Sequence, residues 1–154
     1  MDVKHLQPFL DAFLSVMPQL GFSDVQVGQL SEKRNEVTGN GVFVILGIVG
    51  AFRGNVVYSI EVEAAKKIAS IMMMGMPVEE LDELAKSALS ELTNMLTATA
   101  ATNLSNLVGM TDISTPTVLQ GENVTVQMSS DQILCVQLFV DHIPISLNVA
   151  FEAF

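Results

Sequence analysis

A carboxylate and a carboxamide stand three residues apart, at Glu91 and Asn94, in a stretch with helical hydrophobic periodicity. Ser87 precedes Glu91 by four residues, so the three side chains share one face of a helix. Held rigidly side by side, a carboxylate and a carboxamide could bind a cation and orient a water molecule. The same pair is also common on ordinary solvated helices, so the flanking residues must decide between the two interpretations.

The apolar residues around the pair predict which way this face points. At about 100° per residue, they form a stripe along one side of the helix, made of Leu81, Leu84, Ala85, Ala88, Leu92 and Leu96. Glu91 and Asn94 lie roughly 90–160° from the middle of that stripe. We therefore expect both side chains to point away from the core.

The rest of the same face lacks charge. No charged residue occurs between Glu91 and Asp112, although the helix is expected to run from about 78 to 107. The positions that continue the face are Ala98, Ala101 and Thr102, with Thr97 beside them. A solvated face normally carries Lys, Glu or Arg at such positions. We interpret it as a docking surface, with Ser87, Ala98 and Ala101 as partner contacts.

Composition limits the classes of protein that this chain can belong to. Its 154 residues, 49% of them apolar, fit one domain over 1–154. The net charge of −10, with only seven Lys and Arg, argues against a nucleic-acid partner and against an anionic membrane surface. The longest apolar run, 41–52, is shorter than the ~20 residues of a membrane-spanning helix.

Cysteine and histidine usage gives no sign of a metal or cofactor. Cys135 is the only cysteine, which suits a reducing cytoplasm, and its alternating apolar surroundings predict a core position on a strand. His5 and His142 have no second ligand at metal-binding spacing. Because glycine-rich phosphate loops and nucleophile motifs are also absent from the sequence, we expect no metal and no cofactor bound by this chain.

The order of predicted elements defines the fold class. We expect helices over 3–20, 63–74 and 78–107, and strands over 25–31, 42–52, 56–62, 115–119, 133–140 and 145–152, with 124–128 extending the fourth strand. A polar turn is expected at 36–41, and 121–123 and 131 carry further turn signals. Strands in groups, rather than alternating with helices, predict an α+β fold with a mostly antiparallel sheet and helices packed on one side.

Three motifs in this order resemble the CheC/CheX/FliY family of bacterial chemotaxis phosphatases. They are the segment GNVVYSI at 54–60, the pair EAA at 63–65 and MMMG at 72–75, and the pattern Ser87-x-x-x-Glu91-x-x-Asn94. The length, the single Glu/Asn motif and the N-terminal helix make the CheX-like members the most similar. The resemblance covers essentially the whole chain and implies the CheC/CheX-like version of the α+β fold.

The resemblance also implies an activity, which is hydrolysis of the aspartyl phosphate on a phosphorylated CheY-like response regulator. It implies catalytic roles for two residues, with Asn94 orienting the attacking water and Glu91 pairing with the active-site lysine of the receiver domain. Mg²⁺ is then expected on the phosphorylated partner, because the receiver already holds it against the phosphate. This logic fits phosphoryl transfer, in which positioning and charge stabilisation dominate catalysis.

Two other interpretations stay open at this point. The fold also resembles the middle domain of the flagellar switch protein FliM, which implies a non-catalytic module that binds a receiver or the flagellar switch. The helix face could instead pack on a copy of itself in a purely structural dimer. Independently, we expect a homodimer through the sheet, because the apolar runs 133–140 and 145–151 have little charge to protect a strand edge.

Overall fold

Two strands of unusual length organise the sheet in the computed structural model, which describes residues 3–152. β1 (Val25–Gly50) and β4 (Thr117–Val140) are several times longer than the mean strand of about six residues. They pair antiparallel from Val25 opposite Val140 to Ile45 opposite Thr117, with three register shifts between. Such bulges bend and twist a strand, and β1 pairs with β2 and β3 as well as with β4.

The turns expected inside these two strands are wrong. The polar segment 36–41 belongs to β1, and the turn signals at 121–123 and 131 belong to β4. Instead of reversing the chain, these residues make local irregularities. Asn35 has a φ of 64° at one register shift, and Asn123, with a φ of 53°, accompanies another. Positive φ thus bends the ladder here without ending it.

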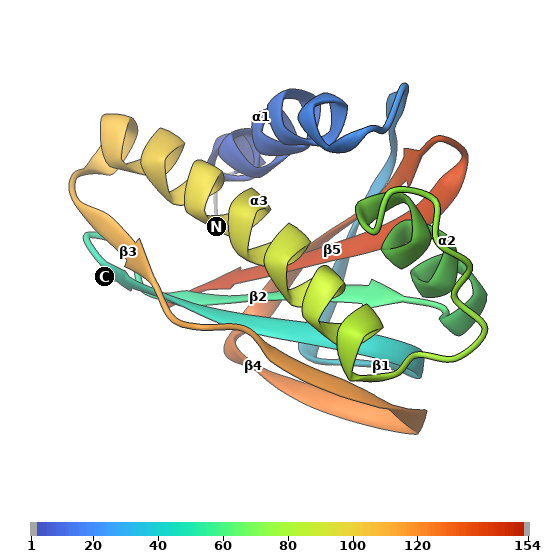
Figure 1. Ribbon diagram of the computed structural model, residues 1–154. Coiled ribbons are helices and arrows are strands. Elements are labelled where there is room, and N and C mark those ends of the chain that lie inside the picture. The colour runs from blue at the N-terminus through green and yellow to red at the C-terminus, as the bar shows by residue number, and fades with distance from the viewer. Residues whose placement is uncertain (1–2, 153–154) are drawn as a thin grey trace.

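Three further strands complete an all-antiparallel sheet. They are β2 (Gly54–Ile60), β3 (Thr111–Ile113) and β5 (Ile143–Phe151), in the order β2-β5-β4-β1-β3. β2 also pairs with β1, from Val42 opposite Ile60 to Ile48 opposite Gly54. The sheet therefore curls, with β1 touching both β2 and β4 (Figure 1).

The helices cover one face of this sheet, as expected (Figure 1). They are the short η1 (Val3–His5) and η2 (Met17–Leu20), together with α1 (Gln7–Val16), α2 (Val62–Met72) and α3 (Glu83–Val108). The predicted helix over 3–20 is thus divided into three pieces, and it ends at Gly21 in the left-handed conformation. The predicted α+β class, antiparallel sheet and one-sided helix layer are confirmed.

The sheet buries apolar side chains on both of its faces. The main core lies between the helices and the sheet and includes Val56 and Tyr58 of β2. Val57, between them, points to the opposite face, where it joins a second cluster under the β1–β4 ribbon. That cluster consists of Val37, Phe43, Val57, Val126, Ile133, Cys135 and Ala150. The predicted core position of Cys135 is confirmed, and burial raises the pKa of its thiol.

The strand edge that the sequence suggested for a dimer is not an edge. The run 133–140 lies between β1 and β5, and the run 145–151 lies between β4 and β2. Their low charge reflects burial in the middle of the sheet, where neither run can pair with another copy. Among the described strands, the first half of β1 pairs on one side only, with β4. No helix within residues 3–152 is long and apolar enough to cross a membrane.

Candidate functional site

The candidate residues lie on α3, whose two ends are defined by local capping. The Asp82 carboxylate accepts a hydrogen bond from the backbone N–H of Ala85 at 2.9 Å, which starts the helix five residues later than the sequence predicted. Leu81 is buried just before this cap. The helix runs to Val108, and Gly109, with a φ of 113°, follows it as expected.

A buried chain of hydroxyl groups fixes α3 against the sheet. Tyr58 on β2 and Thr97 on α3 are both fully buried, and their oxygens lie 2.8 Å apart. The Thr97 hydroxyl also donates to the carbonyl oxygen of Thr93 at 2.7 Å. Because a hydroxyl carries one hydrogen, the Tyr58 O–H must donate to Thr97. Burial raises the pKa of Tyr58 far above its ordinary value, so the phenol stays protonated and keeps donating.

This contact sets the rotation of the helix and therefore the direction of the candidate pair. Thr97 lies about 120° from Glu91 around the helix axis and Leu92 about 100° on the other side. With Leu92 and Thr97 both buried, Glu91 projects outward and is exposed, while Asn94 is half-buried at the border of the face. Within residues 3–152, neither side chain has a hydrogen bond or an ion pair. Both are thus available to another molecule.

Three other expectations for this face can be compared with the structure. Ser87 and Ala98 are exposed on the same side as Glu91, as the spacing predicts. Ala101 is only 5% exposed, so its expected place on the docking surface is wrong. Ala101 lies about 80° from Glu91 around the helix axis. Beside it, the Ser105 hydroxyl donates to the Ala101 carbonyl and accepts a hydrogen bond from the backbone N–H of Thr111. The chain leading into β3 covers this flank of the helix.

Leu84 also lies elsewhere than the hydrophobic pattern predicts. It was assigned to the buried stripe, yet its side chain is 59% exposed. Because α3 begins at Glu83, Leu84 lies in its first turn. Seven residues separate it from Glu91, which is almost two full turns, so the two side chains point in directions that differ by only about 20°. Its spacing from Glu91 could have revealed this, because 84, 91 and 98 form one line along a helix.

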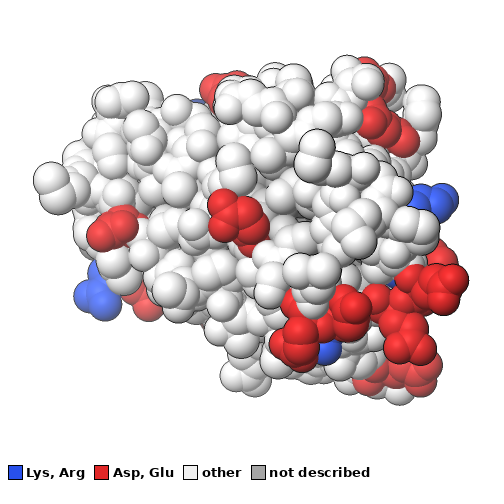
Figure 2. All heavy atoms as spheres, in the orientation of Figure 1, with Lys and Arg blue, Asp and Glu red and all other residues white. Residues whose placement is uncertain are grey.

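The surface around the pair is convex and nearly free of charge. Figure 2 shows that the side of the molecule formed by α1 and α3 is mostly uncharged, with acidic side chains gathered toward the beginning of α3. A cavity of about 740 Å³ does exist, but it lies between α2 and the β4–β5 turn, lined by residues such as Lys66 and His142. Small substrates are bound in concave sites. An exposed helix face cannot enclose one, so chemistry here requires a second macromolecule to cover it.

The described residues offer no alternative centre for metal chemistry. Across 3–152, no group of three or more His, Cys, Asp or Glu side chains is arranged to hold a metal ion. Asp141, which precedes His142, is already bound within the chain. Its carboxylate accepts hydrogen bonds from the backbone N–H groups of Ser23 and Asp24. It thereby ties the β4–β5 turn to the segment before β1.

Comparisons with known proteins agree with this fold. Residues 42–139 match the family Chemotaxis phosphatase CheX. The CheY-P phosphatase CheX of Thermotoga maritima is 39% identical over 127 residues, which are 82% of this chain and 82% of that protein. A CheC-like superfamily protein from a Shewanella species has a TM-score of 0.86 and 28% identity, over 99% of this chain and 100% of that chain.

A third similar structure is the CheX–CheY–BeF3–Mg²⁺ complex from Borrelia burgdorferi. Its matched chain has a TM-score of 0.82 and 23% identity, over 99% of this chain and 100% of that chain. The fold is of the CheC/CheX type, in which helices cover one face of a curled antiparallel sheet. The chain belongs to the chemotaxis phosphatase CheX family.

The hydroxyl chain predicts a difference between two threonines of α3. Thr97→Val leaves the Tyr58 phenol buried without an acceptor, so we expect it to lower the free energy of unfolding by about 1–3 kcal/mol. Thr102→Val is the matched control, because the exposed Thr102 hydroxyl bonds only the Ala98 carbonyl. It should change stability by less than about 0.5 kcal/mol. Urea denaturation measures both, and equal effects would show that the Tyr58 contact does not fix the helix.

Proposed function

We propose that this chain docks on a phosphorylated CheY-like receiver domain and accelerates hydrolysis of its aspartyl phosphate. The observation that carries the proposal is the Glu91/Asn94 pair on a nearly uncharged helix face, where Glu91 is exposed and Asn94 is half-buried at the border, neither with a partner in the described part of the chain. The pair alone has no group to act on, and a partner domain would have to bring the phosphate to it. The names of the relatives, a CheY-P phosphatase and a CheX–CheY complex, support the same assignment.

Asn94 positions the attacking water in this proposal. Its carboxamide has both a donor and an acceptor, so it can hold one water molecule in line with the phosphorus without taking its proton. The water oxygen forms a bond to phosphorus while the bond between phosphorus and the aspartyl oxygen breaks. The electron pair of that bond leaves with the aspartate carboxylate, and the proton of the water goes to the phosphate and solvent. Inorganic phosphate and the unmodified receiver are the products.

Glu91 anchors the helix in this proposal. Its carboxylate pairs with the active-site lysine of the receiver in a charge-assisted hydrogen bond, which sets how deeply α3 enters. As the last acid of α3, Glu91 is followed by no charged residue through Val108, the end of the helix, which lies nearly five turns further on. A single lysine thus meets a single carboxylate, and the register of docking is defined. Ser87 and Ala98 contribute contacts beside it.

Mg²⁺ belongs to the receiver in this proposal. The Borrelia burgdorferi relative forms a complex that contains CheY, BeF3 and Mg²⁺, and the cation supplies charge stabilisation for the phosphoryl group. The residues of this chain contribute the water and the anchor only. We place the reaction in the cytoplasm, because the one cysteine, Cys135, is a buried free thiol.

The alternative is a non-catalytic module of the FliM middle-domain type, which binds a receiver or the flagellar switch. Such a module would bind through the uncharged helix face alone. It would not need Asn94 at the border of that face, because it has no water to position. The presence of both Glu91 and Asn94, without partners inside the described part of the chain, favours the phosphatase. Tight receiver binding without faster loss of phosphate would favour the module.

Asn94→Ala separates catalysis from docking. We expect the turnover rate on a phosphorylated receiver to fall by about 100-fold, since the water loses its positioning group. The receiver concentration at half-maximal rate should stay within about threefold of the parent value. Release of inorganic phosphate, followed at several receiver concentrations, measures both quantities. A full turnover rate in this variant would contradict the proposed mechanism.

Glu91→Ala is the matched variant in the same assay. It should raise the receiver concentration at half-maximal rate by about tenfold or more, because docking loses a charge-assisted contact. Because binding is weaker, the rate at low receiver concentration should fall by a similar factor. If Glu91→Ala bound and turned over like the parent, the anchoring role would be wrong while the role of Asn94 would stand.

We further propose that the chain is a homodimer, joined through the first half of β1. Residues 25–34 belong to the one-sided stretch of this strand, and Val27 and Leu30 are exposed there. Strand pairing there leaves the outward face of α3 open on both copies. Light scattering should give twice the chain mass of 16.6 kDa, and Leu30→Lys should lower it. A parent mass of one chain at micromolar concentration would exclude the dimer.

A further inference from the structure

Asn148 on β5 is a polar residue in the middle of the sheet. Its side chain is fully buried, and it lies directly opposite Cys135 on β4 and Val57 on β2. Directly paired residues of antiparallel strands project from the same face of a sheet. Because Val57 and Cys135 belong to the second cluster, Asn148 lies on the face of the sheet opposite the helices.

One half of the Asn148 carboxamide has a partner and the other half has none. Its Nδ2 donates to the backbone carbonyl of Val57 at 3.0 Å. Since two carbonyl oxygens cannot pair, this contact fixes the orientation of the amide, with Nδ2 toward β2 and Oδ1 toward β4. Within residues 3–152, Oδ1 is the one buried side-chain nitrogen or oxygen atom without a hydrogen-bond partner. An unpaired buried acceptor costs free energy, which a molecule that donates a hydrogen would recover.

A small pocket, which we call the Asn148 pocket, lies on this side of the amide. Its volume is about 260 Å³, and its lining residues come from β1, β4 and β5, with none from β2. The buried residues Asn148 and Cys135 form its floor, and the more exposed side chains of Gln29, Ser31, Lys33, Gln137 and Ser146 form its wall. Oδ1 is therefore turned toward the pocket. A ligand reaches it by displacing the long, exposed side chains of the wall.

Lys33 is the one charged residue in the lining of the Asn148 pocket. Its ammonium group has no ion-pair partner in the described part of the chain. Burial raises the pKa of the Cys135 thiol, and the positive charge of Lys33 partly offsets this rise. The ammonium group is thus close enough to the floor to act on a negative charge there. The pocket combines an unpaired buried acceptor with a free cation, among neutral hydroxyl and carboxamide groups.

These groups define the chemistry of a ligand. It donates a hydrogen bond to Oδ1, and the donor is neutral, because burying an ammonium group against one neutral acceptor would cost too much free energy. It is anionic where it meets Lys33, and it has few atoms. We propose that the Asn148 pocket binds a small carboxylate with a hydroxyl or amide N–H group, which places its donor on Asn148 Oδ1 and its carboxylate beside Lys33.

The proposed site is separate from the candidate catalytic face, because α3 lies on the other side of the sheet. It is also compatible with the proposed dimer. Strand pairing at the edge of β1 uses backbone groups, whereas the side chains of the pocket project from the face of the sheet. The competing occupant is a single ordered water molecule, which also donates hydrogen bonds. A water molecule has no charge, so its binding would not depend on Lys33.

The test compares four small molecules in NMR titrations of the ¹⁵N-labelled protein, following the side-chain amide signals of Asn148. L-Lactate has the hydroxyl and the carboxylate, propionate lacks the hydroxyl, and lactamide lacks the charge. N-Acetylglycine has an amide N–H in place of the hydroxyl. We expect L-lactate or N-acetylglycine to shift these signals at millimolar concentration. Propionate should bind at least about tenfold more weakly, since a site built for a donor rejects an analogue without one.

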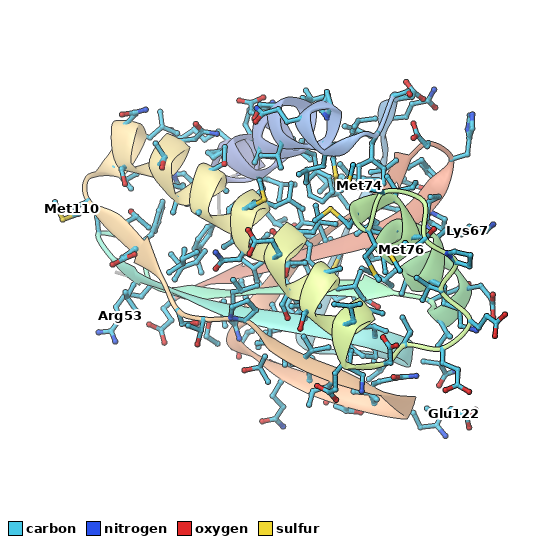
Figure 3. All side chains as sticks on the ribbon, viewed as in Figure 1. Arg53, Lys67, Met74, Met76, Met110 and Glu122 are labelled. Carbon is cyan, nitrogen blue, oxygen red and sulfur yellow. The ribbon has the colours of Figure 1, made fainter. Side chains whose placement is uncertain are left out.

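A lysine variant and a matched control test the charged side of the site. Lys33→Met removes the charge and keeps a long apolar side chain, and we expect it to weaken binding of the carboxylate by about threefold or more. Lactamide should bind the parent more weakly by a similar factor. Lys67→Met is the control, because Lys67 is also an exposed lysine, and Figure 3 shows it projecting outward from α2. It should leave binding unchanged.

Asn148→Leu removes the acceptor and keeps the branching of the side chain, so it should abolish binding. If this variant does not fold, the comparison of L-lactate with propionate still tests the same contact. Equal binding of these two molecules would overturn the proposal. Unshifted Asn148 signals with both L-lactate and N-acetylglycine would also overturn it and leave water as the occupant. Equal losses in Lys33→Met and Lys67→Met would exclude a local role for Lys33 and overturn the proposed site.

Discussion

The rotation of α3 is the constraint on which the site depends. The buried Tyr58 phenol and Thr97 hydroxyl join the helix to the sheet at one defined angle, and Leu92 is buried on the other side. Because successive residues turn by about 100°, this angle also decides that Glu91 faces outward and that Asn94 lies at the border. A rotation of one residue position would bury the carboxylate against apolar side chains, at a large cost in free energy. Stability and site geometry are therefore set by the same contact.

A convex site divides the chemistry between two molecules. In the proposed mechanism, the helix supplies a water-positioning carboxamide and an anchoring carboxylate, and the receiver supplies the phosphate, the cation and the lysine. Water is excluded from the reacting groups only once the two surfaces meet, and electrostatic interactions strengthen as they do. This explains why the face carries so little charge beyond Glu91. Each additional charge would have to lose its hydration on docking without gaining a partner.

Local patterns in the sequence predicted the helical layer, the α+β class and the outward direction of Glu91, because periodicity reports directly on burial. They failed where long-range pairing overrides local propensity. Polar and glycine-rich segments such as 36–41 look like turns, yet each is a bulged part of a continuous strand paired with a distant segment. Leu84 and Ala101 were misplaced for other reasons. Leu84 lies on the line of the helix that carries Glu91, and Ala101 is covered by the chain entering β3.

The most direct test of the account follows the oxygen of the attacking water. A phosphorylated CheY-type receiver with Mg²⁺ is mixed with this protein in ¹⁸O-labelled water, and both products are analysed by mass spectrometry while the rate of phosphate release is recorded. The account predicts release at least 100-fold faster than from the receiver alone, with the label in inorganic phosphate and none in the receiver aspartate. Release no faster than that from the receiver alone, or label in the aspartate carboxylate, would contradict it.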